Sequence, residues 1–400
     1  MDDTSTELEG RLRDFITKVC QDIGPRSPCG PAEGACATYY ESVLQDYCDE
    51  VATEQFFARP SAYKWSFRIP MILYLAAVAF YWWLPVASLV FAAAGFIIMI
   101  GEMMMMHEVI DFAFPKRPSV NVVGKIKSAG ETKQVVVIEG HLDSNWEFPL
   151  MRLMGAAFTI VPGVNTFSAA LLLLLSLVKS ISVLASIDLG AVFAAVELGL
   201  FWVFVVAAPF AVIQLFFMLS NRPVMGANDN LSAMAVGKEL AAFLSVPANR
   251  LANVEVWIVA VGCEEIGSKG SKAFAAAHRQ ELQGAKVFVV DMVGNKNAPL
   301  EVSKAEMVSA VKMSPELVQL VCTTAAELGI PVKVSSSAGF TDATSFRQVG
   351  IAATSILSMP TSRRTFYYHT RNDTLENMAF ENLVSTYKIC AALLKKLDES

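Results

Sequence analysis

The residues best suited to chemistry in this chain are five side chains of the types that bind transition metals. Each stands at the edge of a strand-like or helix-capping segment, and in chain order they are His141, Asp229, Glu265, Asp291 and His369. A further glutamate, Glu264, directly precedes the third of them. Mixed imidazole and carboxylate ligation suits zinc, although manganese or cobalt can substitute in such a site. The pattern therefore predicts a hydrolase with two zinc ions.

Taken alone, each of these residues has a plainer explanation. His141 could be a hydrogen-bonded histidine of the core, while His369 or Asp229 could cap the helix that follows it. The chain holds only four histidines, and the other two, His107 and His278, lack acid-rich turns of this kind. The metal prediction therefore depends on the set of residues and not on any one member.

The segments that precede the candidate ligands have the patterns of strands. Continuous apolar runs predict three buried strands, at Val254 to Val261, Val287 to Val290 and Ile351 to Leu357. Upstream, Asn121 to Ile126 and Val135 to Ile138 flank a Ser-Ala-Gly turn. This arrangement predicts a β-hairpin whose second strand leads into His141.

Helical patterns alternate with these strands. Helices are predicted at Leu231 to Leu244, Ser271 to His278, Pro315 to about Leu328, and from a capping box at Asp373-Thr374-Leu375-Glu376 toward Lys396. Such alternation predicts an α/β fold with a mostly parallel or mixed sheet that helices cover on both faces. Sheets of this kind bind ligands at the carboxyl ends of their strands, where His141, Glu265 and Asp291 stand.

The composition indicates that part of the chain lies in lipid. Hydrophobic residues make up 54% of the 400 residues and charged residues only 18%, with a mean hydropathy of +0.44. Four apolar runs stand out, at Ile69 to Leu84, Val86 to Ile100, Met154 to Val178 and Leu189 to Leu219. A helical span needs about 20 residues, so we expect four spans in two hairpins. The first two runs are short, and a re-entrant hairpin is the alternative there.

Two hairpins would leave every polar segment on one side of the membrane. The expected order is 1–67 as the first part of a single polar domain, 68–106 as hairpin 1, 107–150 as the domain part with the first ligand, 151–219 as hairpin 2, and 220–400 as the remainder. Lysine and arginine gather near the span ends on the side of the domain, which places the domain in the cytoplasm. The polar, acidic beginning of the chain shows no cleavable signal peptide.

Cysteines and net charge exclude two further classes. Cys20, Cys29, Cys36 and Cys48 cluster near the beginning, but their spacing lacks a CxxC pair, so neither a zinc knuckle nor a disulfide pair is expected among them. Most of these cysteines fall in helix-like stretches, where cysteine is commonly a small buried residue. The net charge of −6 and the lack of a basic stripe argue against a nucleic-acid partner.

In this order the motifs resemble metallopeptidase family 28, the co-catalytic di-zinc aminopeptidases, which also includes glutamate carboxypeptidases and the inactive nicastrin. The resemblance covers most of the sequence outside the apolar runs. It rests on Ile23-Gly24-Pro25-Arg26, His141-Leu142-Asp143-Ser144, Gly226-Ala227-Asn228-Asp229-Asn230, Cys263-Glu264-Glu265-Ile266-Gly267, Asp291-Met292-Val293-Gly294, Thr341-Asp342 through Phe346, and Tyr368-His369-Thr370. It implies a zinc aminopeptidase-like fold into which two transmembrane hairpins are inserted.

The resemblance also implies a role for each site residue. One zinc would be held by His141 and Asp291, the other by Glu265 and His369, and Asp229 would bridge the two. Glu264 would be the general base. Asp143 matches the aspartate that orients the first imidazole through its other nitrogen, and Tyr368 is a candidate donor to the developing oxyanion.

An aminopeptidase is therefore the expected function. A carboxypeptidase or dipeptidase with the same metals is the near alternative, and an inactive scaffold of the nicastrin kind is the distant one. Between His141 and Asp229 lie 87 residues with both apolar runs of the second hairpin. This insertion predicts peptide substrates at the bilayer surface, with simple anchoring as the equal alternative. Glu197, inside a predicted span, is a second functional group, a protonated carboxyl held between helices, or a residue nearer the membrane interface than these limits indicate. Side-chain preference and oligomeric state do not follow from the sequence.

Overall fold

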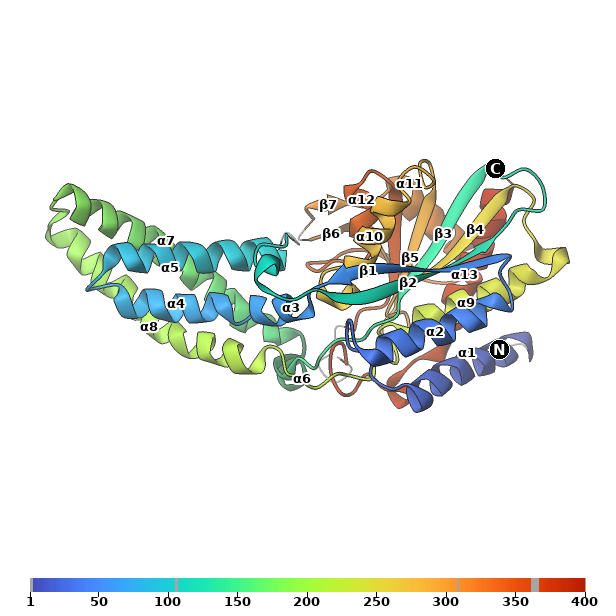
Figure 1. Cartoon of the computed structure of the whole chain (residues 1–400), viewed down its shortest axis with the longest axis horizontal. Helices are drawn as coiled ribbons and strands as arrows, with labels where there is room; N and C mark the ends of the chain where they lie inside the picture. The colour runs from blue at the N-terminus through green and yellow to red at the C-terminus, as the bar shows by residue number, and fades with distance from the viewer. Residues whose placement is uncertain (1–2, 105–106, 308, 361–366, 400) are drawn as a thin grey trace. The chain divides into compact units, whose positions relative to one another are not determined.

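A computed structural model describes residues 3–104, 107–307, 309–360 and 367–399 of the chain (Figure 1). The chain forms two compact units. Unit 1 combines Met1–Ala58, Lys116–Glu147 and Arg222–Ser400, whereas unit 2 combines Arg59–Pro115 and Phe148–Asn221. The limits of unit 2 extend beyond the predicted hairpins, 68–106 and 151–219, at every end.

Unit 1 is built on a mixed sheet, which in the described part of the chain has nine strands. The strands are β1 (Glu50–Ala58), β2 (Arg117–Ile126), β3 (Gln134–His141), β4 (Val254–Val261), β5 (Lys286–Asp291), β6 (Leu300–Glu306), β7 (Val311–Lys312), β8 (Val332–Ser336) and β9 (Ala352–Leu357). Their order is β1-β2-β4-β3-β5-β9-β6-β7, and β8 pairs with β6. The central strands β4, β3, β5 and β9 run parallel to one another.

Helices cover both faces of this sheet, as predicted, because the residues of the central strands that point to either face are mostly apolar. In β4, Val256 and Ile258 pack in the same cluster as α1 (Asp3–Asp22), α2 (Pro31–Gln45), α9 (Leu231–Ser245), α11 (Pro315–Glu327) and α13 (Phe380–Asp398). Trp257 and Val259 point to the other face, where α10 (Lys269–Ala277) and α12 (Ala343–Gln348) lie. The predicted fold class is therefore confirmed.

The predicted hairpin of the second and third strands is wrong. β2 and β3 do not pair with each other, because β4 lies between them and pairs with both. β4 is apolar on both faces, so it is buried only as an interior strand of the sheet. The Ser-Ala-Gly turn instead bonds to the segment before β4, where Ala129 N–H donates to the Leu251 carbonyl at 2.7 Å.

The predicted capping box before the last helix is also wrong. Residues Leu375–Asn377 form a short 3₁₀ helix, and α13 begins at Phe380 without a side-chain cap. The Asp373 carboxylate accepts hydrogen bonds from the backbone N–H groups of Asn228 and Asp229, at 2.7 and 3.0 Å. Asp373 therefore supports the loop that carries a candidate ligand instead of starting a helix.

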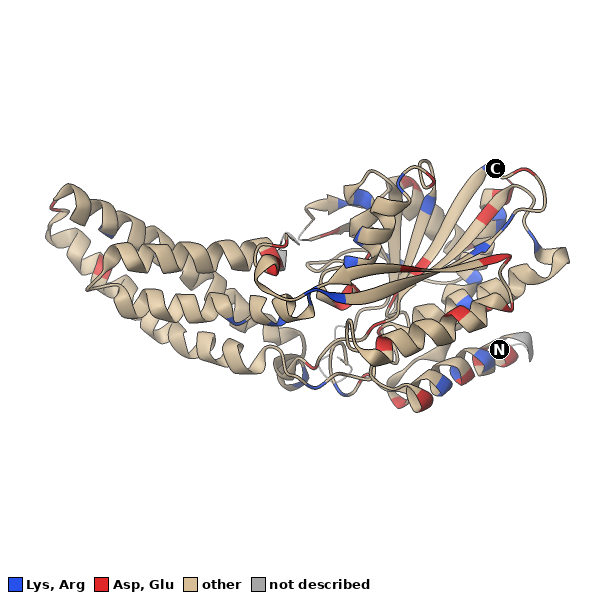
Figure 2. Ribbon diagram, viewed as in Figure 1, with Lys and Arg blue, Asp and Glu red and all other residues tan. Residues whose placement is uncertain are grey.

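Unit 2 is an apolar bundle. Its helices are α3 (Pro60–Ser66), α4 (Ile69–Phe80), α5 (Pro85–Ile98), α6 (Pro149–Met154), α7 (Ile160–Ala185) and α8 (Gly190–Phe217). In the described part of the chain, three helical segments are long and apolar enough to cross a membrane: Pro85–Glu102, Pro149–Ala185 and Gly190–Phe217. α4 has only 12 residues, roughly 18 Å of helix against a hydrocarbon core of about 30 Å. Figure 2 shows few charged residues on these helices.

Several polar residues inside the bundle are paired with one another. Glu197 Oε1 accepts hydrogen bonds from Lys179 Nζ at 2.6 Å and from the Tyr81 hydroxyl at 2.7 Å. Glu197 is therefore a carboxylate held between helices by a basic and a phenolic partner. The Tyr74 hydroxyl similarly contacts Ser168 Oγ at 2.6 Å.

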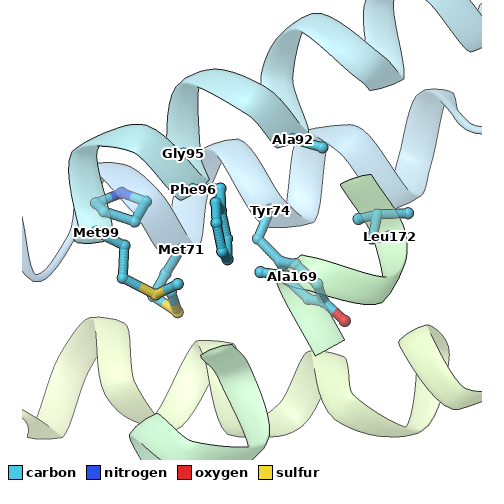
Figure 3. Close-up of a pocket in the computed structure, with 9 residues that line it drawn as sticks. Met71, Tyr74, Ala92, Gly95, Phe96, Met99, Ala169 and Leu172 are labelled. Atoms are coloured by element: carbon cyan, nitrogen blue, oxygen red, sulfur yellow. The ribbon is translucent and has the colours of Figure 1, made fainter. Parts of the chain in front are cut away.

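A small apolar cavity lies among α4, α5 and α7 of unit 2. Figure 3 shows the side chains of Met71, Phe96 and Met99 around it. Its volume is about 10 Å³, which is close to the least that one water molecule requires. The cavity is therefore a packing defect of the bundle and offers no room for an organic ligand.

Candidate metal centre

The predicted ligands meet at one edge of the sheet because they follow adjacent strands. His141 is the last residue of β3, and Asp291 is the last residue of β5. Glu265 lies in a 3₁₀ turn, Glu264–Ile266, three residues after the end of β4. Asp229 precedes α9, whose N-cap is the next residue, Asn230. β3, β4 and β5 are parallel neighbours, so their carboxyl ends converge.

Asp229 lies between the two histidines. Its Oδ1 is 3.1 Å from His141 Nε2, and its Oδ2 is 3.3 Å from His369 Nε2. On the first side, Asp291 Oδ1 is 3.8 Å from His141 Nε2. On the second side, Glu265 Oε2 is 2.8 Å from His369 Nε2. The five side chains thus form two half-sites that share one carboxylate.

The atoms facing this centre fit divalent cations. Among the described residues, His141 Nε2, Asp229 Oδ2, Glu265 Oε1 and Asp291 Oδ1 are buried and make no hydrogen bond. Ligand atoms of His141, Asp229 and Glu265 all lie within 4.8 Å of one another. Buried polar atoms without a hydrogen-bond partner are costly, and a cation bound by imidazole and carboxylate would satisfy all four.

The charges of the centre also call for cations. Burial raises the pKa of Glu264 and of Asp291 well above the ordinary carboxyl value, and neighbouring carboxylates add to the rise. Burial alone would lower the pKa of His369, but Glu265 and Asp229 outweigh it and raise that pKa to about 9. Carboxyl groups held so close together ionise fully only when positive charge lies among them.

Asp143 supports the centre from behind. Its Oδ1 accepts the backbone N–H of Glu264 at 3.0 Å, and its Oδ2 accepts that of Glu265 at 3.1 Å. Asp143 Oδ1 also lies 3.5 Å from His141 Nδ1, the ring nitrogen that faces away from the centre. This fully buried carboxylate therefore links the first histidine to the turn that carries both glutamates.

Glu264 lies beside the centre without facing both half-sites. Its Oε2 is 3.9 Å from His141 Nε2, and its Oε1 accepts a hydrogen bond from Ser268 Oγ at 3.4 Å. The side chain is 10% exposed, so water reaches it. The preceding residue, Cys263, has a positive φ of 55°, a sparsely populated conformation for this residue type. This local turn aims two consecutive glutamates in different directions.

Tyr368 lies next to the second half-site. Its ring stacks on that of His369, with centroids 3.6 Å apart. Burial raises the pKa of Tyr368 well above its ordinary value, and the carboxylates of Asp229 and Glu265 add to the rise. The phenol consequently keeps its proton and can donate a hydrogen bond.

Three supporting residues were not predicted to have a role at the metal centre. Asn145 Nδ2 donates to Glu265 Oε2 at 2.7 Å and contacts the His369 ring. The Arg26 guanidinium, completely buried, donates to backbone carbonyls of the loops that carry His141 and Asp229, those of Leu142, Met225 and Gly226. Burial raises the pKa of Asp373 to about 7, with the charge of Asp229 the next cause. Arg26 carried a sequence signal as part of a motif, and Asp373 carried one only as the expected cap of the last helix.

Gly226 is required where the Arg26 side chain meets the Asp229 loop. Its φ is +61°, and a Cβ atom there would lie 2.3 Å from the Asp229 carbonyl oxygen and 3.0 Å from Arg26 Nη2. Only glycine tolerates both the conformation and the close approach. The backbone of the loop before Asp229 is therefore held against the buried guanidinium of Arg26.

Comparisons with known proteins give a matching family model and similar folds. Residues 211–394 match the model of peptidase family M28. The fold is similar to that of an aminopeptidase from Aneurinibacillus sp. strain AM-1 (16% identity, 96% of this chain and 92% of that chain, TM-score 0.56). It is also similar to a Zn-dependent exopeptidase from Parabacteroides distasonis (15% identity, 97% of this chain and 97% of that chain, TM-score 0.57). A third similar structure is an Acidobacteriales bacterium glutaminyl cyclase (13% identity, 98% of this chain and 94% of that chain, TM-score 0.57). No curated protein matches. At these identities, the likenesses show the fold.

Proposed function

We propose that the chain is a member of peptidase family M28, whose model matches residues 211–394, and that it is a membrane-attached, zinc-dependent exopeptidase, and within that class an aminopeptidase. One observation carries the proposal. Asp229 presents one carboxylate oxygen to each of two histidines, and Glu264 lies buried beside the pair. A shared carboxylate with a neighbouring proton acceptor is what two-metal hydrolysis of an amide requires.

Five residues would hold the metals. His141 and Asp291 would bind one zinc, Glu265 and His369 the other, and Asp229 would bridge. Zinc bound there would act as a Lewis acid toward a peptide carbonyl and would lower the pKa of water in the site. Manganese or cobalt would be accepted by the same donors.

The remaining residues would position groups and move protons. Glu264 would accept a proton from the attacking water and return it to the leaving amine. Asp143 would hold the Glu264 backbone and the His141 ring in place, so that base and ligand keep their spacing. Tyr368, which keeps its proton, would donate a hydrogen bond to the oxyanion that develops on the substrate.

Attachment to a membrane is part of the proposal. β1 pairs with β2, and β3 pairs with β4, so each inserted segment must begin and end on the same side of any bilayer. Two hairpins satisfy this condition, and the first hairpin satisfies it either as two spans or as a re-entrant pair. The basic residues near the hairpin ends support a cytoplasmic site for unit 1: Arg59, Lys64, Arg68, Lys116, Arg117, Arg152 and Arg222.

The experiment that tests the function uses detergent-purified, zinc-loaded protein and peptides with free or blocked amino termini. Products are mapped by mass spectrometry, with Glu264→Gln as the control. Stepwise loss of residues from free amino termini, absent in the control, is the expected result. Cleavage of blocked peptides would indicate carboxypeptidase or endopeptidase action instead. If no peptide is cleaved although metal is bound, the result would favour a narrow substrate range or the inactive scaffold.

The insertion leads us to propose that the substrates are peptides at the bilayer surface. In nanodiscs, a lipid-anchored peptide should be hydrolysed faster than its soluble equivalent at equal total concentration, because both reactants share one surface. The same two peptides compared in detergent, without a shared bilayer, provide the control. Equal rates in nanodiscs would mean that the hairpins serve only as anchors.

A further inference from the structure

Two cysteines far apart in the sequence lie in contact next to the metal centre. The Sγ atoms of Cys29 and Cys263 are 3.3 Å apart, although 234 positions separate the residues. Cys263 is buried, whereas Cys29 is partly exposed. Neither thiol is assigned a role by the proposed peptidase mechanism. Cys263 is also the residue directly before Glu264, so any change in its bonding acts on the turn that carries the base.

One carboxylate holds both cysteines in this position. Glu33, 1% exposed, accepts the Cys29 N–H at Oε2 and the Cys263 N–H at Oε1, both at 2.9 Å. The same Oε1 lies 3.4 Å from the Cys263 sulfur. Because the two backbones share an acceptor, the approach of the two sulfurs is built into the fold and does not depend on free rotation of an exposed loop.

The surroundings of Cys263 are packed tightly. A Cβ atom on the preceding Gly262 would lie 2.4 Å from Ser119 Oγ and 3.1 Å from Glu33 Oε1. Ser119 Oγ itself donates to Glu33 Oε2 at 2.8 Å. Cys263 therefore has little freedom to move, and the partly exposed Cys29 is the partner that can approach it.

We propose that Cys29 and Cys263 are a modification site, at which a reversible disulfide fastens the N-terminal segment to the catalytic turn. A disulfide needs a sulfur–sulfur distance of about 2.05 Å, so the present contact must close by roughly 1.2 Å. Side-chain rotation at Cys29 supplies a movement of that size. The inference concerns only the two thiols and stands whether or not the proposed peptidase activity is correct.

The reaction balances with a low-molecular-weight disulfide as oxidant. The Cys29 sulfur, the more accessible one, attacks the oxidant, which forms a mixed disulfide and releases one thiol. The Cys263 sulfur then attacks the Cys29 sulfur and releases the second thiol. Two protein thiols lose two electrons and two protons in total, and one disulfide is reduced to two thiols. A reducing environment reverses both steps.

The test uses the full-length protein in detergent, first reduced and then treated with oxidised glutathione. Free thiols are alkylated, the protein is digested, and linked peptides are identified by mass spectrometry. The expected product joins Cys29 to Cys263. Cys29→Ser must abolish it, whereas Cys48→Ser, a matched change at another partly exposed cysteine, must leave it intact.

A second measurement reports whether the link fastens the fold. The thermal midpoint of the oxidised protein should rise by several degrees and return to its initial value on reduction, because the bond closes a very long loop. This rise should occur in Cys48→Ser and be absent in Cys29→Ser, which is expected to fold because Cys29 is partly exposed.

Three outcomes would overturn the inference. One is glutathione that remains on Cys29 without a link to Cys263. Another is a link from Cys29 to a different cysteine. The third is a Cys29–Cys263 link with an unchanged thermal midpoint. Loss of peptidase activity is not a criterion, so failure here and failure of the proposed function are distinguishable.

Discussion

Glu147 and Arg371 form a two-pronged ion pair in which Arg371 Nε and Nη2 each lie 2.6 Å from a Glu147 oxygen. The Glu147 side chain is 2% exposed, whereas that of Arg371 is 42% exposed. Glu147 follows Asn145 by two residues, and Arg371 follows His369 by two. The pair therefore holds the loop of the second half-site against the segment that also contacts Glu265.

The two partners should differ in the effect of their removal. Arg371→Ala would leave a buried carboxylate without this counter-charge, whereas Glu147→Gln would leave a guanidinium that water can solvate. We expect the thermal midpoint to fall more for Arg371→Ala than for Glu147→Gln, as measured by fluorescence-detected unfolding in detergent. The thermal midpoint of the double variant should lie near that of Glu147→Gln. Equal losses from the two single variants would mean that the pair contributes as a surface ion pair only.

Asp143→Asn should weaken zinc binding and catalysis together. The asparagine amide nitrogen would face one of the backbone N–H groups of Glu264 and Glu265, which the carboxylate now accepts. Loss of such an outer partner costs about 10- to 100-fold in metal affinity or activity. Competition with a chromophoric zinc chelator measures the affinity, and kcat at saturating zinc measures the activity. Asp49→Asn, at a partly exposed acid on the surface, is the control and should change neither.

Metal stoichiometry should distinguish the bridging ligand from the others. Removal of His369 should abolish one half-site, so His369→Ala should retain about one zinc per chain. Asp229→Ala should retain less than that, because both half-sites lose a donor and the anion between two cations is gone. Plasma mass spectrometry after gel filtration gives the ratio. His278→Ala, a histidine bound to Glu54 outside the centre, should keep the full content. Equal content in the His369 and Asp229 variants would exclude a bridge.

The sequence predicted best those elements whose signal is local. β4, β5 and β9 are short apolar runs with turn residues at their ends, and their limits differ from the predicted ones by a single residue at most. Because the ligands stand directly after such runs, the parallel order of the strands brings His141, Glu265 and Asp291 together. The position of β4 between β2 and β3 has no local signal, since it depends on which strands can be buried on both faces.

The supporting residues could not be predicted for the same reason. Asp373 looks like the beginning of a helix in the sequence, and its role follows only from the fold that brings it to Asn228. Cys29 was considered with its near neighbours, whereas its contact is Cys263, which lies more than two hundred positions away. Contacts of this separation depend on the whole topology, and one sequence carries no pattern for them.

The ion pair in unit 2 should stabilise the bundle only as a pair. Lys179 and Glu197 side chains are 13% and 10% exposed, so a charge left alone there is poorly solvated. Glu197→Leu should lower the free energy of unfolding by on the order of 3 kcal/mol. The double variant Lys179→Met with Glu197→Leu should be about as stable as the parent protein. Apparent melting in detergent measures both. If the double variant melts as low as the single one, the pair itself contributes stability.

Glu33 should make stability depend on pH. Burial raises its pKa to about 8, and the charge of Asp143 adds to the rise. In the unfolded chain a glutamate titrates near pH 4.3. Between these two values the folded protein holds a proton that the unfolded chain has released, so stability falls as the pH rises from about 4.5 to about 8. Glu33→Gln carries no charge and should lack this fall.

The test compares metal-free, fully reduced parent protein with Glu33→Gln at several pH values from 5 to 8, since bound zinc or a disulfide would alter the charge near Glu33. In Glu33→Gln the amide NH₂ group faces one of the backbone N–H groups that the carboxylate accepts, which lowers stability. This loss of stability is the same at every pH. We therefore expect the thermal midpoint of the parent to fall relative to Glu33→Gln as the pH rises. Parallel curves would show that Glu33 is ionised in the folded protein throughout this range, with its hydrogen bonds from Cys29, Ser119 and Cys263 outweighing burial.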